Sequence, residues 1–163
     1  MIKFTKYVKV SSLEEAYELN KSRANVIMGG MMWLGMQNRN IGTVVDISGL
    51  GLDRIEENDE SYIIGAMVPL RSLECHEGLN EYTKGAVKES LRHIVGVQFR
   101  NMATVGGSLY GRYGFSDVLT LFMAIGASVQ LYKAGTVDIA AFADMPFDND
   151  IPVSYTHLRA HET

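Results

Sequence analysis

Cysteine is almost absent from this sequence: Cys75 stands alone among 163 residues. A single cysteine cannot form a disulfide within the chain, and it cannot supply the several thiolates of an iron–sulfur cluster. This scarcity is typical of a reducing compartment, and residues 1–10 alternate in polarity instead of forming the apolar centre of a signal peptide. The longest apolar run, residues 118–129, is too short to span a bilayer. We therefore expect a cytoplasmic protein without a membrane span.

Positive charge is also sparse and dispersed. The chain has 15 Lys and Arg against 19 Asp and Glu, which gives a formal net charge of −4. Proteins that bind nucleic acids neutralise backbone phosphates with clustered Lys and Arg, so a nucleic-acid partner is not expected. Apolar residues are plentiful, at 47% of the chain, which is enough to bury the core of one domain or two small lobes.

The spacing of apolar residues predicts an α+β protein. Strands are expected where apolar residues alternate or cluster, and helices where they recur every three or four positions. A capping box of Ser11 and Ser12 with Glu14 and Glu15 supports the first helix. Expected strands cover residues 2–10, 26–28, 43–48, 62–66, 129–132 and 137–139. Expected helices run from the capping box to about residue 21, from residue 31 over a short stretch, and over residues 69–76, 82–95 and 116–125.

The chain divides into three parts at this stage. We expect residues 1–52 to form a small N-terminal α/β lobe and residues 53–151 to form a second α+β lobe. The last residues, PVSYTHLRAHET, differ from the acidic segment before them. They resemble the translated adapter read-through that ends some gene models from metagenomic assemblies. We therefore predict a non-native tail over residues 152–163 and assign no function to His157 and His161.

Two pairs of adjacent glycines stand out: Gly29 and Gly30 in VIMGGMMWLGM, and Gly106 and Gly107 in RNMATVGGSLYGRYGFSD. Adjacent glycines adopt positive φ without steric cost, so successive backbone N–H groups can point at one anion. Such a nest suits a phosphate even in an acidic protein. A P-loop is excluded because neither pair leads into Lys-Ser/Thr, and no G-x-G-x-x-G is present. The alternative for each pair is a tight turn between packed elements.

Around these glycines the sequence resembles the FAD-binding subunit, or FAD domain, of the molybdenum hydroxylases. This family includes xanthine dehydrogenase, aldehyde oxidase and aerobic carbon monoxide dehydrogenase. The resemblance runs from Phe4 to about Asp150 and rests above all on RNMATVGGSL, followed by Ser116, Asp117 and an apolar helix. It implies the two-lobed α+β FAD-binding fold of the vanillyl-alcohol oxidase (PCMH-type) class, without the family's C-terminal lobe.

The resemblance also implies a cofactor site. The diphosphate of FAD would lie between the lobes, and Asp117 would match an acidic residue that binds ribityl or ribose hydroxyls. Met31 and Met32 stand where the family commonly has Thr-Asp, so backbone donors remain there without those side-chain contacts. Ser108 replaces a common Asn. The implied FAD-binding residues are Val26, Ile27, Met28, Gly29, Gly30, Met31, Met32, Trp33, Ile94, Ala103, Thr104, Val105, Gly106, Gly107, Ser108 and Asp117.

No catalytic residue or metal site emerges from the sequence. Cys75 and His76 are adjacent on an expected helix and would not face each other, and His93 suits a surface or core position. The acidic EENDE stretch at residues 56–60 spans a predicted hairpin turn. This absence fits a flavoprotein, because redox chemistry belongs to the cofactor.

What the resemblance implies is an FAD-dependent oxidoreductase subunit, xanthine dehydrogenase-like, in a larger complex. Electrons would pass from iron–sulfur clusters on a partner subunit through FAD to NAD⁺, while a molybdopterin subunit oxidises a purine, another N-heterocycle or an aldehyde. Ferredoxin or oxygen could replace NAD⁺ as the acceptor. Two alternatives remain open: a flavin-free assembly or docking subunit, and a binder of another phosphorylated ligand.

Overall fold

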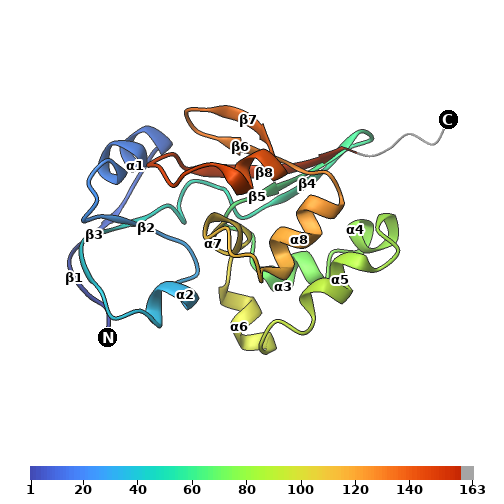
Figure 1. The fold of residues 1–163 in the computed structure, drawn as a ribbon, viewed down its shortest axis with the longest axis horizontal. Coiled ribbons are helices and arrows are strands. Elements are labelled where there is room, and N and C mark those ends of the chain that lie inside the picture. Colours follow the sequence, from blue (N-terminus) through green and yellow to red (C-terminus); the bar gives the residue numbers. More distant parts are fainter. Residues whose placement is uncertain (159–163) are drawn as a thin grey trace.

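The computed structural model describes residues 1–158, which fold around two β-sheets (Figure 1). The smaller sheet has three parallel strands in the order β1-β3-β2. The larger sheet has five antiparallel strands in the order β4-β5-β8-β6-β7, and helices α3 to α8 lie on one side of it. Within residues 1–158, no helix is both long enough and apolar enough to cross a membrane.

The smaller sheet places the first glycine pair at a sheet edge. Both β1 and β2 pair with β3 in parallel, so all three strands end at the same edge, and Gly29 directly follows β2 there. The capping box works as predicted, because Ser12 Oγ accepts the N–H of Glu15 while the Glu15 carboxylate accepts the N–H of Ser11. The elements are β1 (Lys3–Lys9), α1 (Leu13–Asn20), β2 (Val26–Met28), α2 (Met32–Gly35) and β3 (Asn40–Asp46).

The larger sheet and its helices bury the main core, in which Leu73, Leu91, Val105 and Phe122 are almost fully inaccessible. A smaller core under the first sheet includes Ile151, so the two parts of the chain share packing. The strands are β4 (Ile55–Glu57), β5 (Ser61–Gly65), β6 (Ser128–Leu131), β7 (Gly135–Asp138) and β8 (Pro152–Leu158). The helices are α3 (Leu70–Glu74), α4 (Glu77–Tyr82), α5 (Ala86–Leu91), α6 (Val97–Met102), α7 (Val105–Tyr110), α8 (Asp117–Ala124) and α9 (Ile139–Asp144).

The single helix expected over residues 82–95 is wrong. Two helices, α4 and α5, meet there at a left-handed turn in which Lys84 has φ 52° and Gly85 has φ 83°. The N–H of Gly85 bonds back to the carbonyl of Asn80, which is a typical way for a helix to end. Apolar periodicity continues across this turn, so periodicity alone predicts one helix although Gly85 interrupts it.

The segment expected as a tail has a place in the fold. Residues 152–158 form β8, which lies between β5 and β6 and buries Tyr155. Residues 159–163, including His161, lie outside the described part of the chain. Backbone pairing does not depend on side-chain identity, so the non-native origin of residues 152–163 stays a prediction.

Candidate functional site: a cavity between two glycine loops

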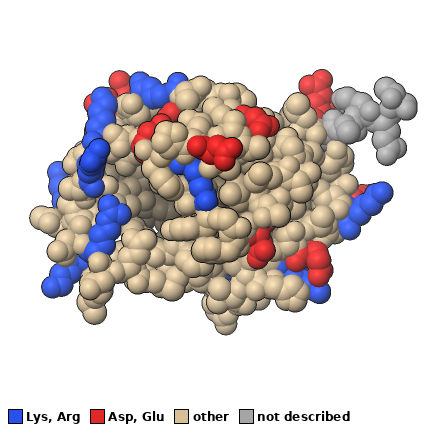
Figure 2. Space-filling model, viewed as in Figure 1, with Lys and Arg blue, Asp and Glu red and all other residues tan. Residues whose placement is uncertain are grey.

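A cavity of about 1080 Å³ lies between the two sheets, and both glycine loops line it. Figure 2 shows the surface hollowed there, with Lys and Arg side chains gathered over the smaller sheet. The sequence-predicted site residues that line the cavity are Val26, Ile27, Gly29, Gly30, Met31, Met32, Trp33, Ala103, Thr104, Gly106, Gly107 and Ser108. Segments about 75 residues apart in the chain thus form one surface.

The first loop, residues 29–33, leaves backbone donors free. None of the hydrogen bonds among residues 1–158 uses the N–H groups of Gly29, Gly30 or Met31. Met31 has φ 64°, in the left-handed region, and its carbonyl accepts the N–H of Gly35 at 2.6 Å. Consecutive free N–H groups at the end of parallel strands suit an anionic ligand such as a diphosphate.

The glycines of the first loop are required by close approach to the second. A Cβ on Gly30 would lie 1.7 Å from the carbonyl oxygen of Met102, and a Cβ on Gly29 would lie 2.9 Å from Thr104 Oγ1. Real side chains do not tolerate such distances. The first loop therefore rests directly on the segment that leads into the second loop.

The second loop, residues 104–108, uses its N–H groups inside the protein. The N–H of Val105 donates to Val68 O, and the N–H of Gly106 donates to Ala66 O. The N–H of Gly107 donates to the Thr104 side chain at 3.2 Å, which caps α7. These donors, which the resemblance implied for the diphosphate, are engaged within the chain. The second loop thus gives the cavity its shape and leaves the Ser108 side chain at its wall.

Further cavity walls were not predicted from the sequence. The first lobe contributes polar side chains, including the two arginines Arg23 and Arg39, and the second contributes Tyr110, Tyr113 and Phe147. The aromatic residues inside the glycine-rich stretch were a signal that could have been used, since flat side chains often flank planar ligands. The remaining wall residues have no local sequence signature.

A strap, residues 147–150, crosses the cavity wall and is tied to both lobes. The Tyr110 hydroxyl donates to the carbonyl of Asp148 at 3.0 Å, and the Asn20 side chain donates to the carbonyl of Asn149 at 2.9 Å. Burial raises the pKa of Tyr110, so its hydroxyl remains a donor at neutral pH. The Asp150 carboxylate accepts N–H groups from residues 133, 134 and 151, which fixes the end of the strap.

Four predicted site residues do not line the cavity: Met28, Ile94, Val105 and Asp117. Asp117 is exposed in the first turn of α8, where an acidic residue stabilises the helix dipole. Val105 is fully buried in the main core. Ile94 packs against that core, and its carbonyl accepts a hydrogen bond from Arg100.

The family described as "FAD binding domain in molybdopterin dehydrogenase" matches residues 2–155. No curated protein matches the chain at a significant level.

Three solved structures resemble the fold closely. Carbon monoxide dehydrogenase from Hydrogenophaga pseudoflava has 21% identity and a TM-score of 0.85, over 96% of this chain and 60% of that one. Quinoline 2-oxidoreductase from Pseudomonas putida 86 has 19% identity and a TM-score of 0.84, over 97% and 60%. Reconstituted CO dehydrogenase from Oligotropha carboxidovorans has 20% identity and a TM-score of 0.82, over 98% and 60%. The chain thus spans 60% of the length of these chains, and the predicted α+β FAD-binding fold is confirmed.

Proposed function

The chain belongs to the family of FAD-binding domains in molybdopterin dehydrogenases, and on that premise we propose that FAD occupies the cavity between the two glycine loops. The observation that carries the proposal is the first loop: the N–H groups of Gly29, Gly30 and Met31 have no partner among residues 1–158, and these residues line a cavity large enough for a dinucleotide. These donors would hold the diphosphate, which needs no basic patch when backbone dipoles converge on it.

The remaining cavity residues have proposed roles as well. Arg23 and Arg39 place positive charge on the first-lobe wall, on the same side as the free N–H groups. The Tyr110 and Trp33 rings offer flat surfaces for planar rings of the cofactor, and Ser108 offers a hydroxyl. Val26, Ile27, Met32, Ala103 and Thr104 supply the apolar and small surfaces that exclude water. Asp117 and Ile94 lie outside the cavity wall and have no role in this proposal.

We further propose that the chain serves as the electron-transfer subunit of a larger, xanthine dehydrogenase-like enzyme. FAD supplies the ability to accept electrons singly and to release them as a hydride. Iron–sulfur clusters and molybdopterin would lie on partner subunits, with NAD⁺ as the proposed acceptor and a purine, another N-heterocycle or an aldehyde as the substrate. A cytoplasmic location is part of this proposal. The protein's own residues would bind, orient and shield the cofactor.

The test is the flavin content of the purified full-length protein. Stoichiometric FAD, released on denaturation and identified by chromatography, is the expected result, together with NADH-dependent reduction of an artificial dye. A protein that stays colourless after incubation with FAD would contradict the proposal and favour the flavin-free assembly subunit. A different phosphorylated molecule released from the protein would favour the third alternative.

A variant pair makes this test specific to the loops. Gly107→Val adds a branched side chain where even a Cβ would lie 3.1 Å from Thr104 Oγ1, so it should disturb the contact between the loops. We expect FAD retention to fall by tenfold or more while the helical content stays nearly unchanged. Gly114→Val is the control, because nothing lies within 4 Å of a Cβ at Gly114. Equal FAD binding by both variants would remove the second loop from the site.

A further inference from the structure

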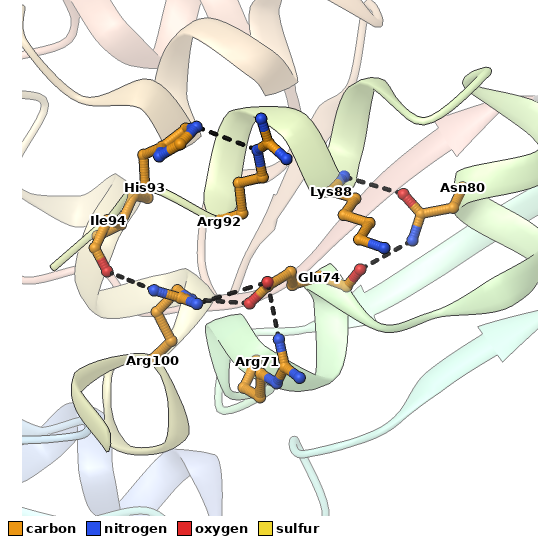
Figure 3. Close-up of polar contacts among 8 residues, drawn as sticks. All are labelled: Arg71, Glu74, Asn80, Lys88, Arg92, His93, Ile94 and Arg100. Atoms are coloured by element: carbon orange, nitrogen blue, oxygen red, sulfur yellow. Dashed lines mark hydrogen bonds and ion pairs between the residues drawn. The ribbon is translucent and has the colours of Figure 1, made fainter. Parts of the chain in front are cut away.

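An ion pair between Glu74 on α3 and Arg100 on α6 is buried in the second lobe (Figure 3). The two side chains are 3% and 5% exposed, and Arg100 Nε lies 2.7 Å from Glu74 Oε2. Arg71 also donates to Glu74 Oε1 at 2.7 Å from a half-exposed position. Desolvation of buried charges is costly, and apolar residues of similar volume often replace such pairs without loss of stability. Stability alone is therefore a weak explanation for this pair.

Arg100 also donates a hydrogen bond to the turn that precedes α6. Its Nη1 group donates to the carbonyl of Ile94 at 3.0 Å, as Figure 3 shows. The next residue, Val95, has φ 51°, which is a strained conformation for a β-branched residue. The hydrogen bond from Arg100 thus holds the turn that leads into α6 in a geometry that the chain would not adopt by itself.

The other end of α6 is fixed to the same helix that carries Glu74. The N–H of Leu70, at the start of α3, donates to the carbonyl of Ala103 at 2.8 Å. Helix α6 is therefore held against α3 through the ion pair of Arg100 with Glu74 and, at its end, through Ala103. It cannot slide along its axis without breaking one of these contacts.

The end of α6 is the surface on which the first glycine loop rests. A Cβ on Gly30 would meet Met102 O at 1.7 Å and the Cα of Ala103 at 3.0 Å, so the backbones are in direct contact. A shift of α6 by a fraction of an ångström would move the free N–H groups of the first loop. Ligand affinity is sensitive to displacements of this size.

We propose that Arg100, oriented by Glu74, is a positioning residue for the cofactor cavity: it sets the position of α6 and thereby of the first glycine loop. The role of the cavity in FAD binding rests on the function proposed above, whereas the mechanical link from Arg100 to the loop does not. Arg100 lies outside the cavity and acts through Met102 and Ala103.

Two variants separate positioning from stability. Arg100→Lys keeps a positive charge beside Glu74 but has no planar fork with which to reach both Glu74 and Ile94 O. The double variant Glu74→Leu/Arg100→Met removes both charges and keeps apolar packing, so it should still fold cooperatively. Arg92→Lys is the matched control, because Arg92, at the end of α5, forms an exposed ion pair with Glu89 of the same helix.

The readouts are amide hydrogen exchange in two segments, at Ile94 and at Gly35, whose N–H groups donate to Leu91 O and Met31 O, and the dissociation constant of FAD. In both Arg100 variants we expect exchange at the two segments to rise about tenfold and FAD affinity to fall about tenfold to hundredfold, with Arg92→Lys unchanged. Unchanged exchange at Gly35 in a folded variant would overturn the proposal. If the parent protein does not bind FAD, the proposed function fails, while the exchange measurement still decides this inference.

Discussion

The two glycine loops look alike in sequence and differ in what their backbones do. The first loop leaves the N–H groups of Gly29 and Gly30 without a partner among residues 1–158, and both glycines press against the opposite lobe. In the second loop, the N–H groups of Val105 and Gly106 donate to the carbonyls of Val68 and Ala66. A pair of glycines therefore signals close backbone approach in both cases, but only the first loop keeps donors available for a ligand.

The largest effect should come from breaking the contact between the loops. Gly30→Ala places a Cβ 1.7 Å from Met102 O, an overlap that only a separation of the lobes can relieve. We expect a loss of about 3 kcal/mol or more in the free energy of unfolding, with loss of FAD. Urea denaturation measures the first and flavin absorbance the second.

The control for this substitution is Gly35→Ala in α2. Nothing lies within 4 Å of a Cβ at Gly35, so the change should be neutral or stabilise the protein by about 0.5–1 kcal/mol through helix propensity. If Gly30→Ala proved as stable as Gly35→Ala, the direct contact between the loops would be wrong.

The ion pair of Glu74 with Arg100 should make the free energy of unfolding depend on pH. Burial by itself would raise the pKa of Glu74, but hydrogen bonds from Arg100 and Arg71 outweigh it and the pKa is lowered. A lowered pKa in the folded state stabilises the protein above the ordinary value of 4.5, and this stability is lost as pH falls below it. Glu74→Gln should cost about 1.5–3 kcal/mol at pH 7 and should lose less stability than the parent on acidification.

Denaturation curves at a series of pH values between neutral and acidic check this prediction. Asp46 also has a lowered pKa, because hydrogen bonds from Tyr7 and Ser48 outweigh its burial. Some acid sensitivity will therefore remain in the variant. If the free energies of unfolding of parent and variant fell by the same amount with pH, the pKa of Glu74 would be the same in the folded and unfolded states, and the prediction would be wrong.

The sequence predicted those features that depend on neighbouring residues. The capping box at Ser12 and Glu15, the strand before Gly29 and the turn at Asn58 are local, and the structure has them. The glycine pairs and the family resemblance predict both loops on one site, and both loops line the cavity. Local chemistry and the two glycine pairs thus predict the centre of the candidate site.

What the sequence could not supply depends on distant partners. The carbonyls that occupy the second loop's donors belong to residues about 40 positions earlier, at Ala66 and Val68. The strap is held at the cavity by Tyr110 and Asn20, from different lobes, which bind its carbonyls. No local pattern encodes such pairings, so the roles of Tyr110 and of residues 147–150 emerged only from the fold.

Substitutions of Thr104 should have a smaller effect on stability and should separate its two roles, the N-cap of α7 and the contact with the first loop. Thr104 Oγ1 accepts the N–H of Gly107 and lies beside Gly29. Thr104→Ala should cost about 1 kcal/mol through loss of the N-cap, whereas Thr104→Ser keeps the hydroxyl and most of the stability. Thermal unfolding compares the two variants. Equal destabilisation by Ala and Ser would point to the methyl group instead of the cap.

The smallest effect concerns Met31, whose left-handed backbone has no counterpart among the described residues of the second loop. Met31→Gly removes a backbone strain of about 1–2 kcal/mol, but the greater freedom of glycine in the unfolded chain costs about 0.5–1 kcal/mol. The free energy of unfolding should therefore rise by no more than about 1 kcal/mol. Ser108→Gly, within α7, has no strain to relieve and should destabilise by about 0.5–1 kcal/mol. Because Met31 contributes backbone donors, FAD affinity in Met31→Gly should stay within about fivefold of the parent. If Met31→Gly stabilises the protein and Ser108→Gly destabilises it, only the first loop holds a strained backbone, as expected of a loop that is shaped for a ligand. Equal losses of stability in the two variants would show that the loops do not differ in this way.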